Sequence, residues 1–421
     1  MTRRRVSPRT LVIASGVVLA ALAGCVGQGK YTAEGASLAE KRMSALKAAT
    51  EYSMAEQAFL AGDLDKAERT IDRAIGLSAD VAINYVLAGR IRLEQGRIGE
   101  SLAFFGRAIE INDGLAEAHY YLGVVSERLR RTSDAVNHFM AAAESEPLDP
   151  QFTVAAGEML VDLDRLDEAE EFLMGSAVFD HAPAVKQLLG HISMIRGLHE
   201  EASERFEEAA LLSPSDDAIR EDLVAALVAA GRYAEAEREI TKLMAVDVAS
   251  GGESTGGPAP RRDLMHLRGL CLIALGRPIE ARRIYKDLTD GATGATDLDA
   301  WVGLGRASFL VGDTRSLKQA GERAKAIAPE QSEGPVLLAL YSRAIGDSEA
   351  ALQAIDAFDG EQTPDVRTLR ALILADLGRY DESREQLFIA LEHSPDDRSA
   401  MNLLDRLPER ELDSFANAPT E

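Results

Sequence analysis

The feature that most constrains the fold of this chain is a period of about 34 residues. Gly89, Gly123 and Gly157 are spaced 34 residues apart, and Gly190 follows after 33. In the same rhythm a small residue is followed four positions later by a large apolar one. These pairs are Ser101 and Phe105, Ala135 and Phe139, Ala169 and Leu173, Ala202 and Phe206, and Ala236 and Ile240. A spacing of four places both members on one face of a helix, so the period predicts repeated helices with an apolar stripe.

The stretch from Ala116 to Pro147 shows what one period contains. It reads as two helices joined by a tight turn, and Pro147 ends the second because proline has no backbone N–H for the helical ladder. Such a pair cannot bury its apolar stripe alone and needs copies of itself. The period, the small residues, the aromatic residue and the terminal proline together resemble the tetratricopeptide repeat, whose unit has 34 residues. The resemblance implies an all-α fold, an α-solenoid of about ten helix pairs that forms a right-handed superhelix.

The register places helix pairs along most of the chain. They are expected at 48–81, 82–115, 116–149, 150–182, 183–216, 217–250, 262–295, 298–331, 332–362 and 364–397. Residues 249–261 are rich in glycine, serine and proline and predict a flexible loop between an N-terminal array over 38–248 and a C-terminal array over 262–407. Ser399–Leu407 is expected to cap the last pair, and an acidic tail follows over 408–421. Two interpretations stay open: the loop separates two domains, or it bulges from one superhelix.

The N-terminus predicts export and a lipid anchor. Four arginines precede an apolar run of 13 residues over 11–23, which is shorter than the roughly 20 residues of a membrane-spanning helix, so 1–24 is expected to be a signal peptide. Leu22-Ala23-Gly24-Cys25 resembles the lipobox of bacterial lipoproteins, which implies that Cys25 is lipidated; the alternative is an ordinary cleaved signal peptide before a cysteine. Several acyl chains would hold the chain firmly on a membrane. No aspartate follows Cys25, which favours the periplasmic face of the outer membrane, and 25–37 is expected to be a tether.

Charge and cysteine content exclude several kinds of partner and chemistry. The formal charge of −23 argues against nucleic acid and against electrostatic docking on anionic lipid. If Cys25 is lipidated, Cys271 has no partner for an intramolecular disulfide. Cys271 lies in an apolar helical stretch and is expected to be a buried core residue rather than a reactive thiol.

No motif in the sequence supports catalysis. Residues 252–256 spell G-x-S-x-G, but a helix is expected before them and two prolines follow, whereas a nucleophile elbow lies between a strand and a helix. Asp162, Asp164 and Asp167 lack the spacing of a calcium loop and are expected in a helix-end turn. The seven histidines include no H-E-x-x-H and no nearby cysteine pair. We therefore expect no metal site, no cofactor and no enzymatic activity.

The resemblance also implies a binding surface. In the family, positions 2, 5, 9 and 12 of each first helix face the concave side, which takes a protein or peptide partner. Here these positions include Arg90, Tyr120, Val124, Gln187, His191, Met194, His266, Arg306 and Arg343. The family's carboxylate clamp has Lys and Asn at positions 5 and 9; the second pair has Val86 and Arg90, so recognition of a terminal carboxylate is not expected. A mixed apolar groove with Arg and His favours an amphipathic segment. The alternative for Tyr120 and Met194 is packing between neighbouring helices.

The sequence thus predicts a lipid-anchored adaptor or scaffold for protein–protein interaction in the bacterial cell envelope. One alternative is a dedicated assembly subunit of a pilus, secretion or exopolysaccharide machine. Another is an envelope enzyme with helical repeats, which would need a polar cluster in the groove.

Overall fold

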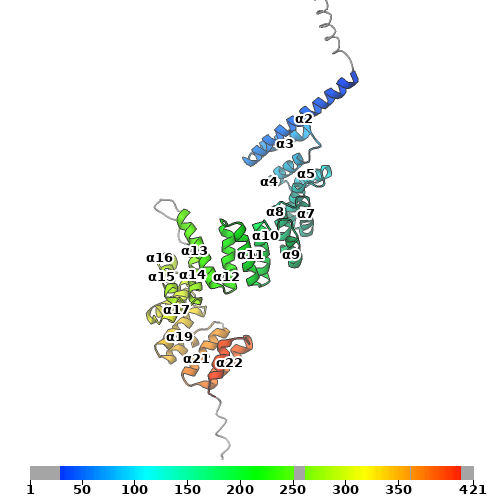
Figure 1. Cartoon of the computed structure of the whole chain (residues 1–421). Helices are drawn as coiled ribbons and strands as arrows, with labels where there is room; N and C mark the ends of the chain where they lie inside the picture. The colour runs from blue at the N-terminus through cyan, green and yellow to red at the C-terminus, as the bar shows by residue number, and fades with distance from the viewer. Residues whose placement is uncertain (1–28, 251–260, 361, 409–421) are drawn as a thin grey trace, which may run out of the picture. The chain divides into compact units, whose positions relative to one another are not determined.

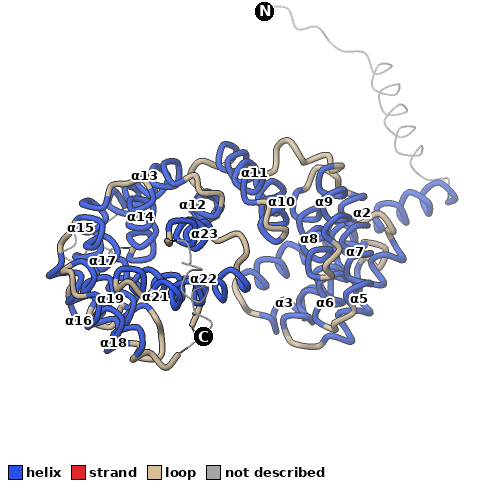
Figure 2. Tube along the Cα trace, turned by 90° about the horizontal axis from the view of Figure 1, so that it is seen from below, coloured by secondary structure: helices blue, strands red, loops and turns tan. Residues whose placement is uncertain are grey.

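The computed structural model describes residues 29–250, 261–360 and 362–408, and these form 22 α-helices joined by short loops (Figures 1 and 2). The predicted signal peptide, Cys25, the acidic tail after residue 408 and most of the predicted loop lie outside these residues. The all-α prediction of about ten helix pairs is confirmed. The handedness of a superhelix stays a prediction.

The chain divides into two compact units, residues 1–188 and 189–421, and the division falls inside α10. The helices of the first unit, with α10 at its end, are α2 (Gly29–Leu60), α3 (Leu64–Leu77), α4 (Ala82–Glu94), α5 (Ile98–Ile111), α6 (Ala116–Arg128), α7 (Thr132–Ser145), α8 (Pro150–Asp162), α9 (Leu166–Met174) and α10 (Pro183–Ile195). In each pair an even-numbered first helix packs against the odd-numbered second helix that follows it.

The second unit continues in the same manner. Its helices are α11 (His199–Leu212), α12 (Asp217–Ala229), α13 (Tyr233–Ser250), α14 (Arg262–Ala274), α15 (Pro278–Thr289), α16 (Gly291–Gly294), α17 (Leu298–Val311), α18 (Thr314–Ile327), α19 (Glu333–Ala344), α20 (Ser348–Asp356), α21 (Pro364–Asp376), α22 (Tyr380–His393) and α23 (Arg398–Arg406). The short α16 shifts the numbering, so α17, α19 and α21 are first helices. Within the described residues no helix is long and apolar enough to cross a bilayer.

The turns between paired helices need left-handed backbone, which explains most of the recurrent glycines. The predicted turn glycines have φ between 68° and 83°: Gly62, Gly96, Gly197, Gly231, Gly276, Gly312, Gly346 and Gly378. The third and fourth pairs place Arg130 and Asp164 there, with φ of 57° and 58°. Asp164 thus lies in a helix-end turn, as predicted.

The glycines inside the first helices, unlike the turn glycines, allow close packing. A Cβ atom added at Gly123 would lie 2.6 Å from the Phe139 ring, and one added at Gly89 would lie 2.5 Å from the Phe105 ring. Each aromatic ring therefore lies directly against the backbone of the preceding helix. This close contact fills the core between the two helices of a pair.

Within each unit the core is a series of clusters, and successive clusters share a helix. In the second unit, Ile240 and Leu243 of α13 belong to one buried cluster with Leu264 and Cys271 of α14. Cys271 is fully buried, and burial raises the pKa of its thiol to about 11, which confirms its prediction as a core residue. The core thus continues from one side of the predicted loop to the other, which favours an insertion into one array.

Two predicted boundaries differ from the structure. The tether was expected over 25–37, but α2 begins at Gly29, so its described part is helical. Alanine, glutamate and lysine favour helix there and outweigh Gly29 and Gly35. At the predicted loop, α13 extends to Ser250, so the first two residues of 249–261 are also helical.

Candidate functional site

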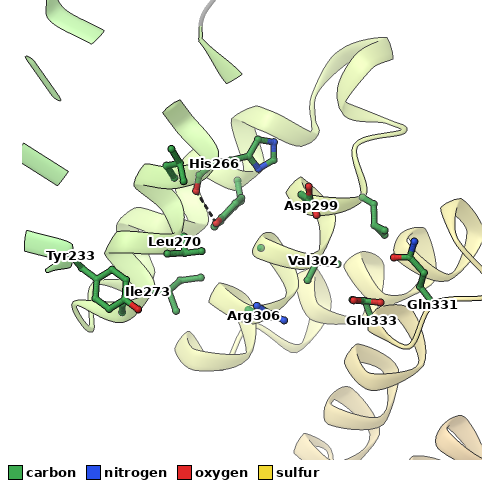
Figure 3. A pocket seen from close by; sticks show the side chains of 14 residues that line it. Tyr233, His266, Leu270, Ile273, Asp299, Val302, Arg306, Gln331 and Glu333 are labelled. Carbon is green, nitrogen blue, oxygen red and sulfur yellow. Dashed lines mark hydrogen bonds between the residues drawn. The ribbon is translucent and has the colours of Figure 1, made fainter. Parts of the chain in front are cut away.

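A pocket of about 480 Å³ in the second unit lies between the first helices α14, α17 and α19 (Figure 3). It contains two of the predicted groove residues, His266 on α14 and Arg306 on α17. Tyr233 from α13 and Tyr285 from α15 also line it. Because three first helices contribute, the pocket forms only when successive pairs stack.

Tyr285 forms the inner wall of the pocket. Its ring lies between two first helices: a Cβ atom at Gly269 would be 2.6 Å from it, and one at Gly303 would be 2.3 Å away. Its hydroxyl donates a hydrogen bond to the carbonyl oxygen of His266 at 3.2 Å. Burial, more than any charge nearby, raises the pKa of Tyr285 to about 12. The phenol therefore stays neutral and is held as a rigid wall.

Most of the lining is apolar. Leu270 and Ile273 of α14 face Val302 of α17 across the pocket (Figure 3). Leu270 is 42% exposed although it lies in the middle of a helix. Such a surface gains free energy when an apolar side chain of another molecule covers it.

Three charged side chains surround this apolar surface. Arg306 and Asp299 belong to α17, and Glu333 begins α19 (Figure 3). Among the residues that the structure describes, none of the three has an ion-pair partner. The arrangement can therefore bind a segment that supplies an apolar side chain and charges of its own.

A hydrogen-bonded network fixes one end of the pocket. Asp297 accepts hydrogen bonds from Arg262 at 2.5 Å and from the backbone N–H of Ala300 at 3.0 Å, where it caps α17. Nε2 of His266 lies 3.0 Å from the same carboxylate. Burial alone would raise the pKa of Asp297, but these partners outweigh it and lower the pKa below its usual range. Asp297 therefore holds the imidazole of His266 beside the start of α17.

We predict that Asp297→Asn lowers the free energy of unfolding by about 2 kcal/mol at neutral pH, because charge-assisted hydrogen bonds to a partly buried carboxylate are lost. A lowered folded-state pKa stabilises the fold above the unfolded-state pKa of about 4, and this contribution disappears as pH falls through the folded-state value. The deficit of the variant should therefore shrink below about pH 4. Urea unfolding of the wild type and the variant at several pH values measures this deficit. Asp290→Asn, at an exposed cap without a side-chain hydrogen bond, is the control; a pH-independent deficit would contradict the assignment.

Arg90 lies in a second cluster, in the first unit. Its guanidinium stacks between two rings, 5.0 Å from the centroid of Phe59 on α2 and 5.1 Å from that of Tyr121 on α6. Burial raises the pKa of Tyr52 to about 12, with Glu56 as the next cause. Burial also raises the pKa of Glu117, while Arg90 opposes that shift. Arg90 is thus already engaged by the fold.

The remaining predicted residues are dispersed. Tyr120 packs between Phe139 and Phe152, with both ring centroids at 5.5 Å, and this agrees with the alternative of packing. Val124 packs on the cluster around Phe105, and Gln187 is half-buried on α10. In the second unit, Nε2 of His191 lies 3.3 Å from Asp222, Met194 packs on the cluster of Phe206, and Arg343 pairs with Asp376 at 2.5 Å.

Sequence reasoning named His266 and Arg306 but not the residues around them. On α14, Leu270 occupies position 9 and Ile273 position 12. On α17, Asp299 and Val302 occupy positions 2 and 5, and Glu333 occupies position 2 of the ninth pair. The same rule, applied without gaps to the seventh, eighth and ninth pairs, would have found all of them. Tyr233 and Tyr285 come from second helices, which the rule for first helices does not include. Tyr285 nevertheless occupies the repeat's large apolar position, four residues after Ala281.

Among the described residues, no group of three or more His, Cys, Asp or Glu side chains is placed to hold a metal ion. Cys25, the predicted lipidation site, lies outside the described residues.

Comparison with known proteins agrees with the repeat architecture. Family models described as tetratricopeptide repeat match residues 115–174, and 48–73 together with 364–387. No curated protein matches the chain in sequence.

Solved structures resemble the chain at low identity. A structure titled for Pseudomonas aeruginosa pilF is 19% identical and covers 50% of this chain and 91% of its own, with a TM-score of 0.38. A tetratricopeptide repeat protein of Parabacteroides merdae is 18% identical, with coverage of 62% and 99% and a TM-score of 0.39. Yeast Tom70 is 16% identical, with coverage of 82% and 76% and a TM-score of 0.37.

Proposed function

We propose that this chain, a tetratricopeptide repeat protein of all-α architecture, is a non-catalytic adaptor that captures a segment of another protein. The capture site is the pocket between α14, α17 and α19. The observation that carries the proposal is the combination in one pocket of an exposed apolar surface and three charges without ion-pair partners among the described residues. A folded chain keeps such a surface in water at a free-energy disadvantage, which a bound segment would remove.

Leu270→Glu tests the capture site. A buried carboxylate at the apolar contact would abolish binding, and because Leu270 is 42% exposed, the free variant should fold normally. Wild type and variant would be used as bait on detergent-solubilised envelope, with captured proteins identified by mass spectrometry. Ile279→Glu is the matched control, since Ile279 is 70% exposed on α15 and does not line the pocket. Proteins retained by the control and lost by Leu270→Glu are partners of the site; identical capture by both variants would refute the proposal.

The adaptor is further proposed to be anchored by lipid at Cys25 to the periplasmic face of the outer membrane. The support is the sequence alone: the basic start, the short apolar run and the lipobox-like Leu22-Ala23-Gly24-Cys25. An adaptor held in this way would keep its partner at the membrane surface.

We expect Cys25→Ala to abolish labelling by a fatty-acid analogue and to move the chain from the membrane fraction to the soluble fraction, because the acyl chains supply the membrane affinity. Fractionation of cells expressing wild type, Cys25→Ala or Cys271→Ala measures the shift. Cys271→Ala should keep both the label and the membrane association. If Cys25→Ala partitions as the wild type does, the anchor proposal is wrong.

A further inference from the structure

Two pockets of the second unit each contain an acidic residue at the start of a first helix and an arginine. The pocket already described has Asp299 in the first turn of α17 and Arg306 two turns later. A second pocket, also of about 480 Å³, lies between α21 and α23, with Asp365 in the first turn of α21 and Arg406 at the end of α23. In the first pocket the acid and the arginine lie on one helix, whereas in the second they lie on two neighbouring helices, α21 and α23.

These charges do not serve the fold through ion pairs. In the described part of the chain, Asp299, Glu333, Asp365, Arg306 and Arg406 have no ion-pair partner. Arg343 on the intervening helix α19 differs, since it pairs with Asp376 at 2.5 Å. Opposite charges that stay unpaired beside apolar surface are available to a ligand.

The spacing on α17 gives the pattern that a ligand must match. Asp299, Val302 and Arg306 follow one another along one face of the helix, at positions i, i+3 and i+7 (Figure 3). The two charges are therefore about 10 Å apart along the helix axis, with apolar surface between them. A helix laid along α17 presents its own side chains at the same spacing.

We propose that the pocket takes an amphipathic helix whose contact face carries a basic residue, an apolar residue and an acidic residue at i, i+3 or i+4, and i+7. This inference rests on the proposed capture function and defines its ligand. The basic side chain pairs with Asp299 and Glu333, the apolar side chain covers Leu270 and Val302, and the acidic side chain pairs with Arg306. The order can run either way along the partner, because a helix can lie parallel or antiparallel to α17.

Three synthetic probes test the pattern. They are end-capped, alanine-rich helical peptides with leucine at i+3 and i+4 and a fluorescent label, and they carry Lys and Glu, two Lys, or two Glu at i and i+7. Fluorescence anisotropy with the full chain gives their affinities. The mixed peptide should bind about fivefold more tightly than either other peptide, which is the scale of one exposed ion pair. The comparison with the two-lysine peptide is stringent, because the formal charge of −23 on the chain attracts that peptide without any specific contact.

Arg306→Glu makes the pocket wholly acidic and should reverse the ranking, so that the two-lysine peptide binds best. Lys318→Glu changes the net charge equally on the exposed face of α18, outside the pocket, and should leave the ranking unchanged. Circular dichroism confirms that both variants are folded.

Equal affinities across the peptides, or a preference of the wild type for two lysines, would overturn the charge pattern. If the peptides gave either result and Leu270→Glu still abolished their binding, the capture function would stand and only the charge pattern would be wrong. Absence of binding by every peptide also overturns the pattern, and the envelope capture experiment then decides the function separately.

Discussion

Gly89→Ala is expected to lower the free energy of unfolding by about 2 kcal/mol, although alanine favours helix over glycine. The added Cβ would lie 2.5 Å from the ring of Phe105, which is fully buried and cannot move aside. Such overpacking costs about 3 kcal/mol, and the higher helix propensity of alanine offsets about 1 kcal/mol of it. Urea unfolding followed by circular dichroism measures the loss.

Gly106→Ala is the matched control, in the middle of the adjacent helix α5. No atom lies within 4 Å of a Cβ added there, so helix propensity alone acts and the variant should be more stable by about 1 kcal/mol. Opposite signs for the same substitution would show that the aromatic ring sets the requirement for glycine. Equal effects of the two would contradict the contact.

The other helix pairs of the chain indicate which second substitution should restore the stability lost in Gly89→Ala. Where the first helix has glycine, the residue sixteen positions later is aromatic in four pairs: Gly89 and Phe105, Gly123 and Phe139, Gly190 and Phe206, Gly269 and Tyr285. Where it has alanine or valine, the partner is aliphatic: Ala55 and Ile71, Val224 and Ile240, Ala339 and Ile355, Ala371 and Leu387. Gly157 and Gly305 depart from the rule. A Cβ atom at Gly157 would lie 2.9 Å from both Leu173 and Leu188, and Gly305 is followed by Gly321, so a Cβ atom there would instead lie 2.6 Å from Leu337. Adding Phe105→Ile should therefore restore much of the stability that Gly89→Ala removes.

Phe206→Ala is expected to destabilise the second unit by about 3–5 kcal/mol, the largest effect predicted for a single substitution. Phe206 is 1% exposed, and its ring lies against Gly190 and, at 5.0 Å between centroids, against the edge of His191. Removal of the ring leaves a cavity that neighbouring helices cannot close without moving. The destabilisation would appear as loss of the helical circular dichroism signal at a much lower urea concentration than in the wild type.

Phe388→Ala provides the comparison, because Phe388 is 60% exposed on α22. Its effect should stay within about 0.5 kcal/mol. If Phe206→Ala were as mild, the packing between α10 and α11 would not be as described.

The period predicted the helix pairs because every copy repeats the same physical requirements. Gly96 and the other turn glycines needed positive φ, and Phe139 needed a small residue on the preceding helix, so both left regular traces in the sequence. The start of α2 was predicted too late because Gly29 and Gly35 lower the helix propensity of this segment. In addition, nothing in a single period marks where the first helix begins.

The candidate site was predicted only in part. Helical position identified His266 and Arg306 as groove residues, because it reports which side of a helix a residue occupies. It does not report whether that side is filled. Tyr120 and Val124 occupy equivalent positions, yet they pack on neighbouring side chains and are half-buried, and Arg343 is held by Asp376. Those differences depend on contacts between helices of different pairs, which the spacing within one pair cannot show.

The packing of each pair on its immediate neighbours has a consequence for how the chain folds and changes. Within the described residues every buried cluster joins helices that follow one another in sequence, such as α2 to α4 or α13 with α14. Contact order is therefore low, and the entropy of closing long loops hardly opposes folding. Nucleation can occur at any well-matched pair and propagate outward, so unfolding need not be a single step. For the same reason a gene duplication could add a 34-residue pair and lengthen the binding surface while the rest of the core stays unchanged.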